Sequence, residues 1–314
     1  MCGIEGKRRI QGSGGNSVFG KGVVIHNQQA GAAGTERMMN QVKEALEPLT
    51  DSLHFHSEDT PGDAIAWLAD EQNEMDTVWI LGGDGTVHTC MDGIRQRRSI
   101  PTVGILPAGT CNDFARMLGI PLQPVQAAQA ASECRIEKKD IGLYNDQAFT
   151  NFVGVGLIAD ASENINEQLK GAVGRLSYFL SAWQSIRRQE PFTYELTMDS
   201  ETIRGEAVMI LVCNGRFLGT AEFPSPQISI DDGILDILVV EEAGLQLFRD
   251  WMQRAGEQSI MHTESVRHYR SSAVNLVTTP SKEMDADGEI EGYTPVKLSL
   301  MHQTIPFLTA GASE

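Results

Sequence analysis

The sequence predicts an α/β domain with a parallel sheet, followed by a second, mostly antiparallel β domain. Three observations predict this order. Apolar strands alternate with helix-like segments up to about residue 120, glycine-rich turns follow two of these strands, and beyond Pro121 strand follows strand with little helix between. Alternation is typical of a parallel sheet flanked by helices, whereas consecutive strands are typical of antiparallel sheets. We therefore expect a Rossmann-like first domain and a β-sandwich-like second domain.

The first domain contains four predicted strands and four predicted helices. Short apolar or β-branched runs predict strands at 21–27, 53–58, 76–83 and 102–109. Apolar residues at helical spacing predict helices at 35–49, 62–73, 87–97 and 111–120. The last of these helices begins near Asn112 or Asp113, either of which suits a helix cap.

The second domain is predicted from a series of strand-like runs after a linker-like segment at 121–134. Helix is expected in it only at about 160–188 and 244–260. The expected limits are a flexible segment at 1–20, an α/β domain at 21–130, a β-rich domain at 131–300, and a segment at 301–314 that returns to the first domain.

Composition excludes several classes of protein. The chain of 314 residues carries 42 acidic and 25 basic residues, so its field repels nucleic acid, and we expect no nucleic-acid partner. No apolar stretch approaches the roughly 20 residues that span a bilayer, and we expect a soluble, cytoplasmic protein. The five cysteines lack paired CxxC spacing, which predicts reduced thiols rather than disulfides or a zinc site.

The run ILGGDGTVHTCMDGI, residues 80–94, carries the first chemical signal. Gly82, Gly83 and Gly85 let backbone amides approach a ligand, and the following helix directs its positive end to the same place, which suits phosphate. Asp84 in such a turn would bond to a ribose or a loop amide, or meet the cation of a nucleoside triphosphate. By itself, the run is more often only a tight turn between strand and helix.

A second run, GILPAGTCNDFARMLGIP at 104–121, repeats the pattern of strand, small-residue loop and polar helix start. Two such strand ends would meet at the carboxyl edge of one sheet, where parallel α/β folds bind ligands. GGDGT together with PxGTxNDFAR resembles the diacylglycerol kinase catalytic-domain family, which includes bacterial soluble lipid kinases, sphingosine kinases and ceramide kinases. GGDGT alone is also found in NAD kinases, but the second run separates the lipid kinases from them.

The resemblance implies roles for individual residues. It implies that ATP is bound by Asn27, Gly31, Gly82, Gly83, Asp84, Gly85, Thr86, Gly109, Thr110, Asn112, Asp113 and Glu289. The run MDADGEI resembles the family's Asp-Gly-Glu, so Asp287 matches the proposed general base, and Asp84 is assigned to catalysis with it. A carboxylate in reach of a lipid hydroxyl can accept its proton as the phosphoryl group moves. By itself, DADGE also fits an acidic hairpin turn.

The resemblance also implies a magnesium position, formed by the Asp232 carboxylate and backbone carbonyls at Ser229 and Ile234. A structural turn explains DDGILD equally well. Several departures from the family's pattern indicate a divergent branch. The first loop reads NQQAG at 27–31, and Glu58 stands where a threonine is expected. After GGDGT, His88, Thr89 and Asp92 replace an asparagine, a glutamate and a second asparagine, and Cys111 replaces a glycine.

The segment 169–192 is the one stretch whose charge opposes the acidic whole. Arginine and lysine residues flank apolar ones there, which predicts an amphipathic helix that packs on the β domain or contacts a membrane surface. A lipid kinase must reach its substrate at a bilayer, so we expect transient peripheral membrane association. Because bacterial relatives form dimers, the resemblance also leaves a homodimer open.

The function expected from the sequence is that of an ATP- and Mg²⁺-dependent lipid kinase in lipid metabolism. Diacylglycerol is the default acceptor that the resemblance implies, and phosphatidylglycerol or a sphingoid base stays open. Two alternatives remain at this point. One is a NAD kinase, which shares GGDGT but does not require PAGTCNDFAR, and the other is a nucleotide-binding regulatory protein without turnover.

Overall fold

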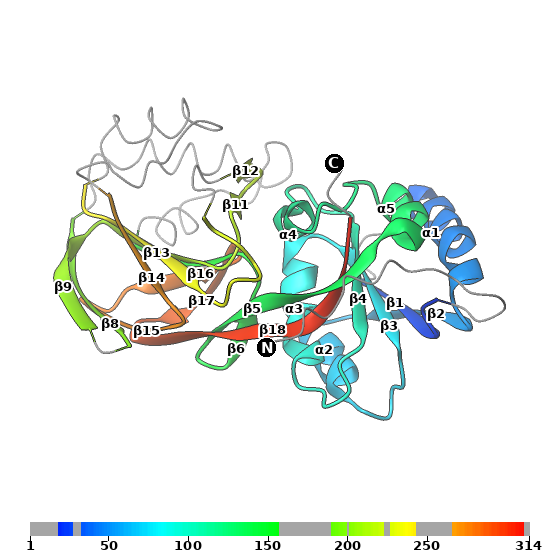
Figure 1. Cartoon of the computed structure of the whole chain (residues 1–314), viewed down its shortest axis with the longest axis horizontal. Coiled ribbons are helices and arrows are strands. Elements are labelled where there is room, and N and C mark those ends of the chain that lie inside the picture. The colour runs from blue at the N-terminus through cyan, green and yellow to red at the C-terminus, as the bar shows by residue number, and fades with distance from the viewer. Residues whose placement is uncertain are drawn as a thin grey trace, which may run out of the picture. The chain divides into compact units, whose positions relative to one another are not determined.

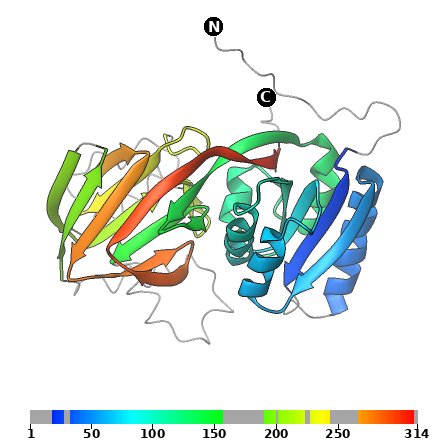
Figure 2. The ribbon, with the colours of Figure 1, turned by 90° about the horizontal axis from the view of Figure 1, so that it is seen from below.

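The structure is a computed structural model that describes residues 18–27, 33–156, 190–199, 201–222, 227–242 and 266–310. The chain forms two compact units, shown in Figures 1 and 2. The first comprises Met1–Lys139 and Gln303–Glu314, and the second comprises Asp140–His302. The predicted boundary after residue 130 coincides with the end of a helix, and the start of the following strand still belongs to the first unit.

The first unit contains the parallel sheet that the sequence predicts. Strands β1 (Lys21–Asn27), β2 (Ser52–Glu58), β3 (Thr77–Gly82) and β4 (Thr102–Pro107) lie in the order β2-β1-β3-β4. All three pairings are parallel. Strand β18 (Val296–Thr309) ends in this unit, where Phe307 pairs in parallel with Val103 of β4. The apolar side chains of β3 and β4 are buried because helices cover both faces of the sheet.

The helices divide between the two faces. Helices α2 (Pro61–Ala69) and α3 (Asp84–Ile94) pack together, and α1 (Ala33–Leu46) packs with α5 (Pro124–Ala130) on the opposite face (Figure 1). A short helix, α4 (Asp113–Met117), follows β4. The 3-10 turns η1 (Glu47–Leu49) and η2 (Ala131–Glu133) follow α1 and α5.

Two expectations about the helices were wrong in detail. The segment 121–134 is not a linker, because α5 begins with Pro124 at its first turn, where proline favours a helix, and continues through alanines. Helix α3 begins at Asp84, three residues earlier than the expected start at residue 87, so the glycine-rich run itself forms its first turn.

The second unit is built from two sheets. One contains β5 (Arg135–Tyr144), β6 (Gln147–Phe149), β8 (Phe192–Met198), β9 (Glu201–Ala207), β15 (Ala273–Thr279) and the start of β18. The other is wholly antiparallel and contains β14 (Val266–Ser271), β13 (Leu235–Val240), β10 (Met209–Cys213), β7 (Phe152–Gly156), β16 (Glu283–Ala286) and β17 (Glu289–Tyr293), in that order. A small ribbon pairs β11 (Phe217–Leu218) with β12 (Ala221–Glu222).

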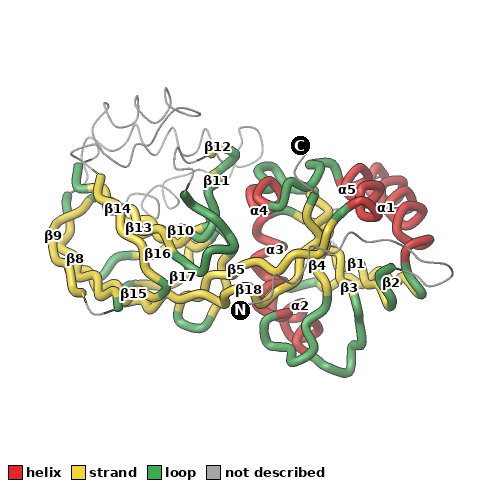
Figure 3. The backbone as a smooth tube through the Cα atoms, in the orientation of Figure 1, coloured by secondary structure: helices red, strands yellow, loops and turns green. Residues whose placement is uncertain are grey.

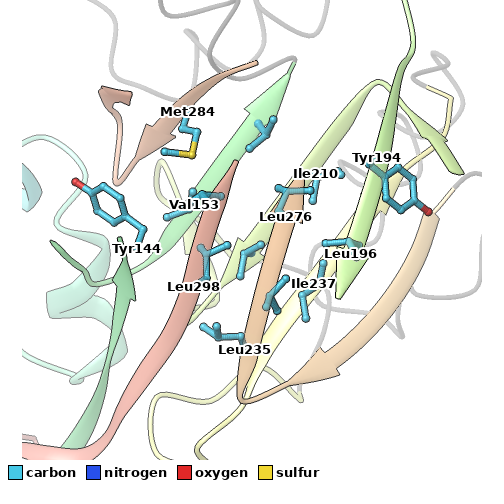
Figure 4. Close-up of a cluster of buried hydrophobic side chains, with 14 of the residues drawn as sticks. Tyr144, Val153, Tyr194, Leu196, Ile210, Leu235, Ile237, Leu276, Met284 and Leu298 are labelled. Carbon is cyan, nitrogen blue, oxygen red and sulfur yellow. The ribbon is translucent and has the colours of Figure 1, made fainter. Parts of the chain in front are cut away.

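The core of the second unit lies between these sheets. Alternate residues of β8, namely Phe192, Tyr194, Leu196 and Met198, face inward, as the two-residue period of a strand requires. They meet Ile210, Ile237 and Leu276 from other strands (Figure 4). This arrangement confirms the predicted combination of an α/β domain with an antiparallel, sandwich-like β domain.

The described residues of the second unit form only strands, turns and loops (Figure 3). The helices expected at 160–188 and 244–260 lie outside the described residues, and so does most of the amphipathic segment 169–192, whose last residue, Phe192, begins β8. Within the part of the chain that the structure describes, no helix has the length and apolar character needed to cross a membrane.

Candidate functional site

Two glycine-containing loops touch at the carboxyl edge of the parallel sheet. Strands β3 and β4 end in register, with Gly82 opposite Pro107, and the Ala108 amide donates to the Gly82 carbonyl oxygen at 2.9 Å. A Cβ atom on Gly109 would lie 2.5 Å from the Cα atom of Gly83. Because real Cβ atoms do not approach that closely, both positions require glycine, and the two sequence motifs form one continuous backbone surface.

Asp84 connects the two loops. It is the first residue of α3, it is buried, and its Oδ1 atom accepts a long hydrogen bond of 3.4 Å from the Phe114 amide in the first turn of α4. A carboxylate at a helix amino terminus is stabilised by the unpaired amides and the helix dipole. The bond to a loop amide is one of the roles that the sequence predicts for this aspartate.

Asn112 holds the second loop closed. Its Oδ1 atom accepts from the Gly109 amide, and its Nδ2 atom donates to the Gly109 carbonyl, each at 2.9 Å. Its φ of 53° lies in the left-handed region, which asparagine tolerates better than most residues. The loop is therefore shaped before any ligand binds, while Ala108, Gly109 and Thr110 remain exposed.

The structure thus brings together most of the residues predicted to bind ATP, on the β3–α3 and β4–α4 turns: Gly82, Gly83, Asp84, Gly85, Thr86, Gly109, Thr110, Asn112 and Asp113. Asn27 ends β1 and pairs with Glu58 of β2 at the same edge. The side chain of Asn27, and the whole of Gly31, lie outside the described residues.

Asp287 lies in the second unit, in the turn between β16 and β17, with a left-handed φ of 51°. Its buried carboxylate accepts four hydrogen bonds. Oδ2 accepts from the Thr150 amide at 2.7 Å and the Thr150 hydroxyl at 3.0 Å, and Oδ1 accepts from the amides of Asn151 at 2.8 Å and Phe152 at 3.1 Å. The side chain therefore clamps the segment that leads into β7, and Glu289 stands exposed two residues later.

Sequence reasoning missed the partners of this clamp. Thr150 and Asn151 are buried, and the Asn214 side chain donates to the Thr150 carbonyl at 2.8 Å and to the Asp140 carbonyl at 3.2 Å. The available signal was the pair of polar residues inside the apolar run AFTNFVGVG, because buried polar groups require partners.

The structure describes contacts within the protein at the predicted magnesium position, and its assignment to a cation stays a prediction. Oδ1 of Asp232 accepts from the Ile234 amide at 3.1 Å, Oδ2 contacts the Arg270 guanidinium, and the Ser229 hydroxyl donates to Asp231 at 2.5 Å. Burial raises the pKa of Asp232, a change that these two contacts partly oppose. Among the described residues, no group of three or more His, Cys, Asp or Glu side chains could hold a metal. A cation at Asp232 would lie beside the positive charge of Arg270, and we assign no step to a metal here.

Two further aspartates, Asp140 and Asp236, make contacts around the loop 229–234 that contains Asp232. Asp140 has an exposed fraction of 0%, and its carboxylate accepts from the Gly233 amide at 2.7 Å and pairs with His302 Nδ1 at 2.8 Å. Asp236, equally buried, pairs with His268 Nε2 at 2.6 Å. These contacts connect the loop to β5, β14 and β18, and sequence reasoning had assigned no role to either aspartate.

Comparison with protein families decides the chain's identity. The model of the "Diacylglycerol kinase catalytic domain" matches residues 21–144, and that of the "YegS C-terminal NAD kinase beta sandwich-like domain" matches residues 151–309. The chain belongs to the diacylglycerol kinase catalytic-domain family. It is thus a member of a family of lipid kinases, as the two glycine-containing motifs predict, and its catalytic domain implies use of ATP.

Relatives match almost the whole chain. A Staphylococcus aureus (strain MSSA476) protein named "Putative lipid kinase SAS0691" is 30% identical over 92% of this chain and 96% of its own. A crystal structure titled as that of a "putative diacylglycerol kinase" from Bacillus anthracis str. Sterne has a TM-score of 0.85 at 31% identity, covering 94% of this chain and 99% of the other. A structure titled as a diacylglycerol kinase from the same organism has a TM-score of 0.81 at 31% identity, covering 93% and 97%.

Proposed function

We propose that the protein transfers the γ-phosphoryl group of ATP to the hydroxyl group of a lipid alcohol, with diacylglycerol as the first acceptor to test. The observation that carries this proposal is the backbone contact between Gly83 and Gly109. It joins two turns, one of them opening the 11-residue helix α3, at the sheet edge where α/β folds bind ligands.

The first unit supplies the nucleotide site in this proposal. Exposed backbone at residues 108–110 and the amino terminus of α3 favour a polyanion, because unpaired amides and the helix dipole present positive charge there. Mg²⁺ enters with ATP as part of the substrate, and Asp84 lies at the turn where that cation would arrive.

The second unit supplies the base. In the proposed step, the lipid O–H proton passes to the Asp287 carboxylate as the new O–P bond forms. The bond between the γ phosphorus and the oxygen that bridges the β and γ phosphates of ATP breaks, and ADP leaves. Since that carboxylate already accepts four hydrogen bonds, proton uptake requires it to give up one of them. The Thr150 hydroxyl is the partner most readily released, because a hydroxyl can rotate while a backbone amide cannot.

The acceptor brings the protein to a membrane surface. A chain with 42 acidic and 25 basic residues requires a local basic patch for contact with anionic lipid, and the segment 169–192 carries the matching charge. We include transient peripheral association of a cytoplasmic protein in the proposal. Vesicle co-sedimentation unchanged by Arg187→Glu with Arg188→Glu would contradict the role of this segment.

A transfer assay tests the proposed reaction. The purified protein is incubated with labelled ATP, Mg²⁺ and mixed micelles containing diacylglycerol, phosphatidylglycerol or sphingosine, with NAD as a water-soluble acceptor. The proposal is supported if the wild-type protein transfers label to a lipid. The Asp84→Asn and Asp287→Asn variants should lose this transfer, and the Glu74→Gln variant should retain it. Glu74 is a suitable control because it is an exposed residue paired with Lys21. Label in NADP would contradict it, and ATP binding without any labelled product would favour the regulatory alternative.

A further inference from the structure

A charged side chain stands at the nucleotide edge of the first unit, outside both glycine-containing loops. Glu58 is the last residue of β2, and it pairs in register with Asn27, the last residue of β1. In the strand order β2-β1-β3-β4, this places Glu58 two strands from the GGDGT turn, at the same edge of the sheet. Two strand spacings amount to roughly 10 Å.

Glu58 also lies on the face of the sheet where the GGDGT helix packs. His56 and Glu58 are two residues apart on a strand, so their side chains share a face. The His56 ring stacks on Trp67 of α2, with ring centroids 3.7 Å apart and an interplanar angle of 17°. Helix α2 packs against α3, whose first turn contains Asp84, so all these groups occupy one face.

The Glu58 carboxylate is oriented before any ligand binds. Its Oε1 atom lies 2.6 Å from His56 Nε2, and the two side chains are 23% and 27% exposed. Among the described residues, Oε2 has no hydrogen-bond partner in the protein. The imidazole, itself held by Trp67, thus fixes one oxygen, and no described residue of the chain donates to the other.

The chemistry of a carboxylate narrows the choice of that donor. An ionised carboxylate only accepts hydrogen bonds and repels phosphate, so it suits the neutral part of a nucleotide. Acidic residues at strand ends in α/β sheets bind ribose hydroxyls in other nucleotide sites. We propose that Glu58, positioned by His56, accepts hydrogen bonds from the ribose hydroxyls of ATP and so selects ribonucleotides over deoxyribonucleotides. This inference rests on the proposed function.

Calorimetric titration tests it. Wild-type protein, Glu58→Gln, Glu58→Ala and His56→Ala are titrated with the Mg²⁺ complexes of ATP, 2′-deoxy-ATP, 3′-deoxy-ATP and GTP. We expect wild type to bind ATP about tenfold or more tighter than at least one deoxynucleotide, the usual range for a hydrogen bond to a charged group. Glu58→Ala should weaken the binding of ATP by the same factor and leave the affinity for that deoxynucleotide unchanged. His56→Ala should lose part of the preference, because Glu58 remains but is no longer oriented.

The controls separate folding from recognition. Glu74→Gln, which alters a carboxylate ahead of the amino end of β3, should keep the wild-type preference, and circular dichroism should give all variants the same melting curve. Equal binding of ATP and both deoxynucleotides by wild type would overturn the inference, as would tighter ATP binding by Glu58→Ala. A loss by Glu58→Ala that is the same for every ATP analogue but absent for GTP would assign Glu58 to the adenine base and also overturn it. Wild-type protein that transfers phosphate to lipid without any ribose preference would overturn this inference alone, whereas protein that binds no ATP would overturn the proposed function too.

Discussion

Replacing Asp287 with asparagine should loosen the second unit as well as abolish transfer. The carboxylate holds the segment 150–152 through three backbone amides and one hydroxyl. Asparagine has the same shape and tolerates the left-handed φ of 51°, so backbone strain does not change. Its Nδ2 atom, however, cannot accept a hydrogen bond, and two of the four donors lose their partner.

The magnitude follows from those two donors. Each buried donor left without a partner costs about 1–3 kcal/mol, so we expect a loss of roughly 3 kcal/mol in the free energy of unfolding. For a unit of this size, that loss lowers the melting temperature by about 6–12 °C. The same loss should speed hydrogen exchange of the amides of Thr150, Asn151 and Phe152 about a hundredfold if they exchange by opening of this unit.

Two measurements check the prediction: thermal melting by circular dichroism, and hydrogen exchange resolved to residues 150–152. Glu195→Gln is the matched control, because it neutralises an exposed carboxylate on β8 whose partner, Arg204, is also exposed. Thr150→Val, which removes one of the four bonds, should fall between the two. Melting and exchange of Asp287→Asn that equal those of Glu195→Gln would refute the clamp.

Three other predictions concern the loops and the thiols. Gly109→Ala should force the two loops apart and lower transfer about a hundredfold, whereas Gly62→Ala, whose Cβ would meet nothing nearer than 3.9 Å, should keep full activity. Asn112→Ala should be less stable than Asn112→Gly by about 1 kcal/mol in the free energy of unfolding, and should melt at a lower temperature. Both variants lose the two hydrogen bonds to Gly109, but only alanine is strained at a φ of 53°. The reverse order of melting temperatures would contradict this. Burial raises the pKa of Cys90 to about 12 and of Cys134 to about 11, so at pH 8 the thiolate form is rarer in the folded than in the unfolded protein. Labelling of the two thiols, located by mass spectrometry, should be slower in the folded than in the unfolded protein, by about a thousandfold for Cys90 and about a hundredfold for Cys134. Equal labelling rates in the two states would contradict the burial of these thiols.

Local patterns of residues determined the fold class and the nucleotide half of the site. Short apolar runs between helical patterns predict the bounds of β1 to β4 within one or two residues. Because the carboxyl ends of parallel strands meet at one edge of the sheet, the same runs predict where the nucleotide half of the site lies. The glycines at positions 83 and 109 also indicate the site in the sequence, because the close approach of the two backbones excludes any larger side chain. Helix α5 was not predicted, because an alanine-rich segment that follows two closely spaced prolines resembles a linker until a neighbouring helix packs against it.

Only the tertiary structure decided how the acidic residues are used. The sequence determined that Asp287 and Asp232 stand in Asp-Gly turns. The three residues that donate to the Asp287 carboxylate, however, are more than 130 residues away, and Arg270 lies 38 residues from Asp232. Asp140 and His302 come together from opposite ends of the second unit in the same way. Contacts over such distances leave no periodic trace in the chain, since they are selected by packing of whole sheets rather than by neighbouring residues.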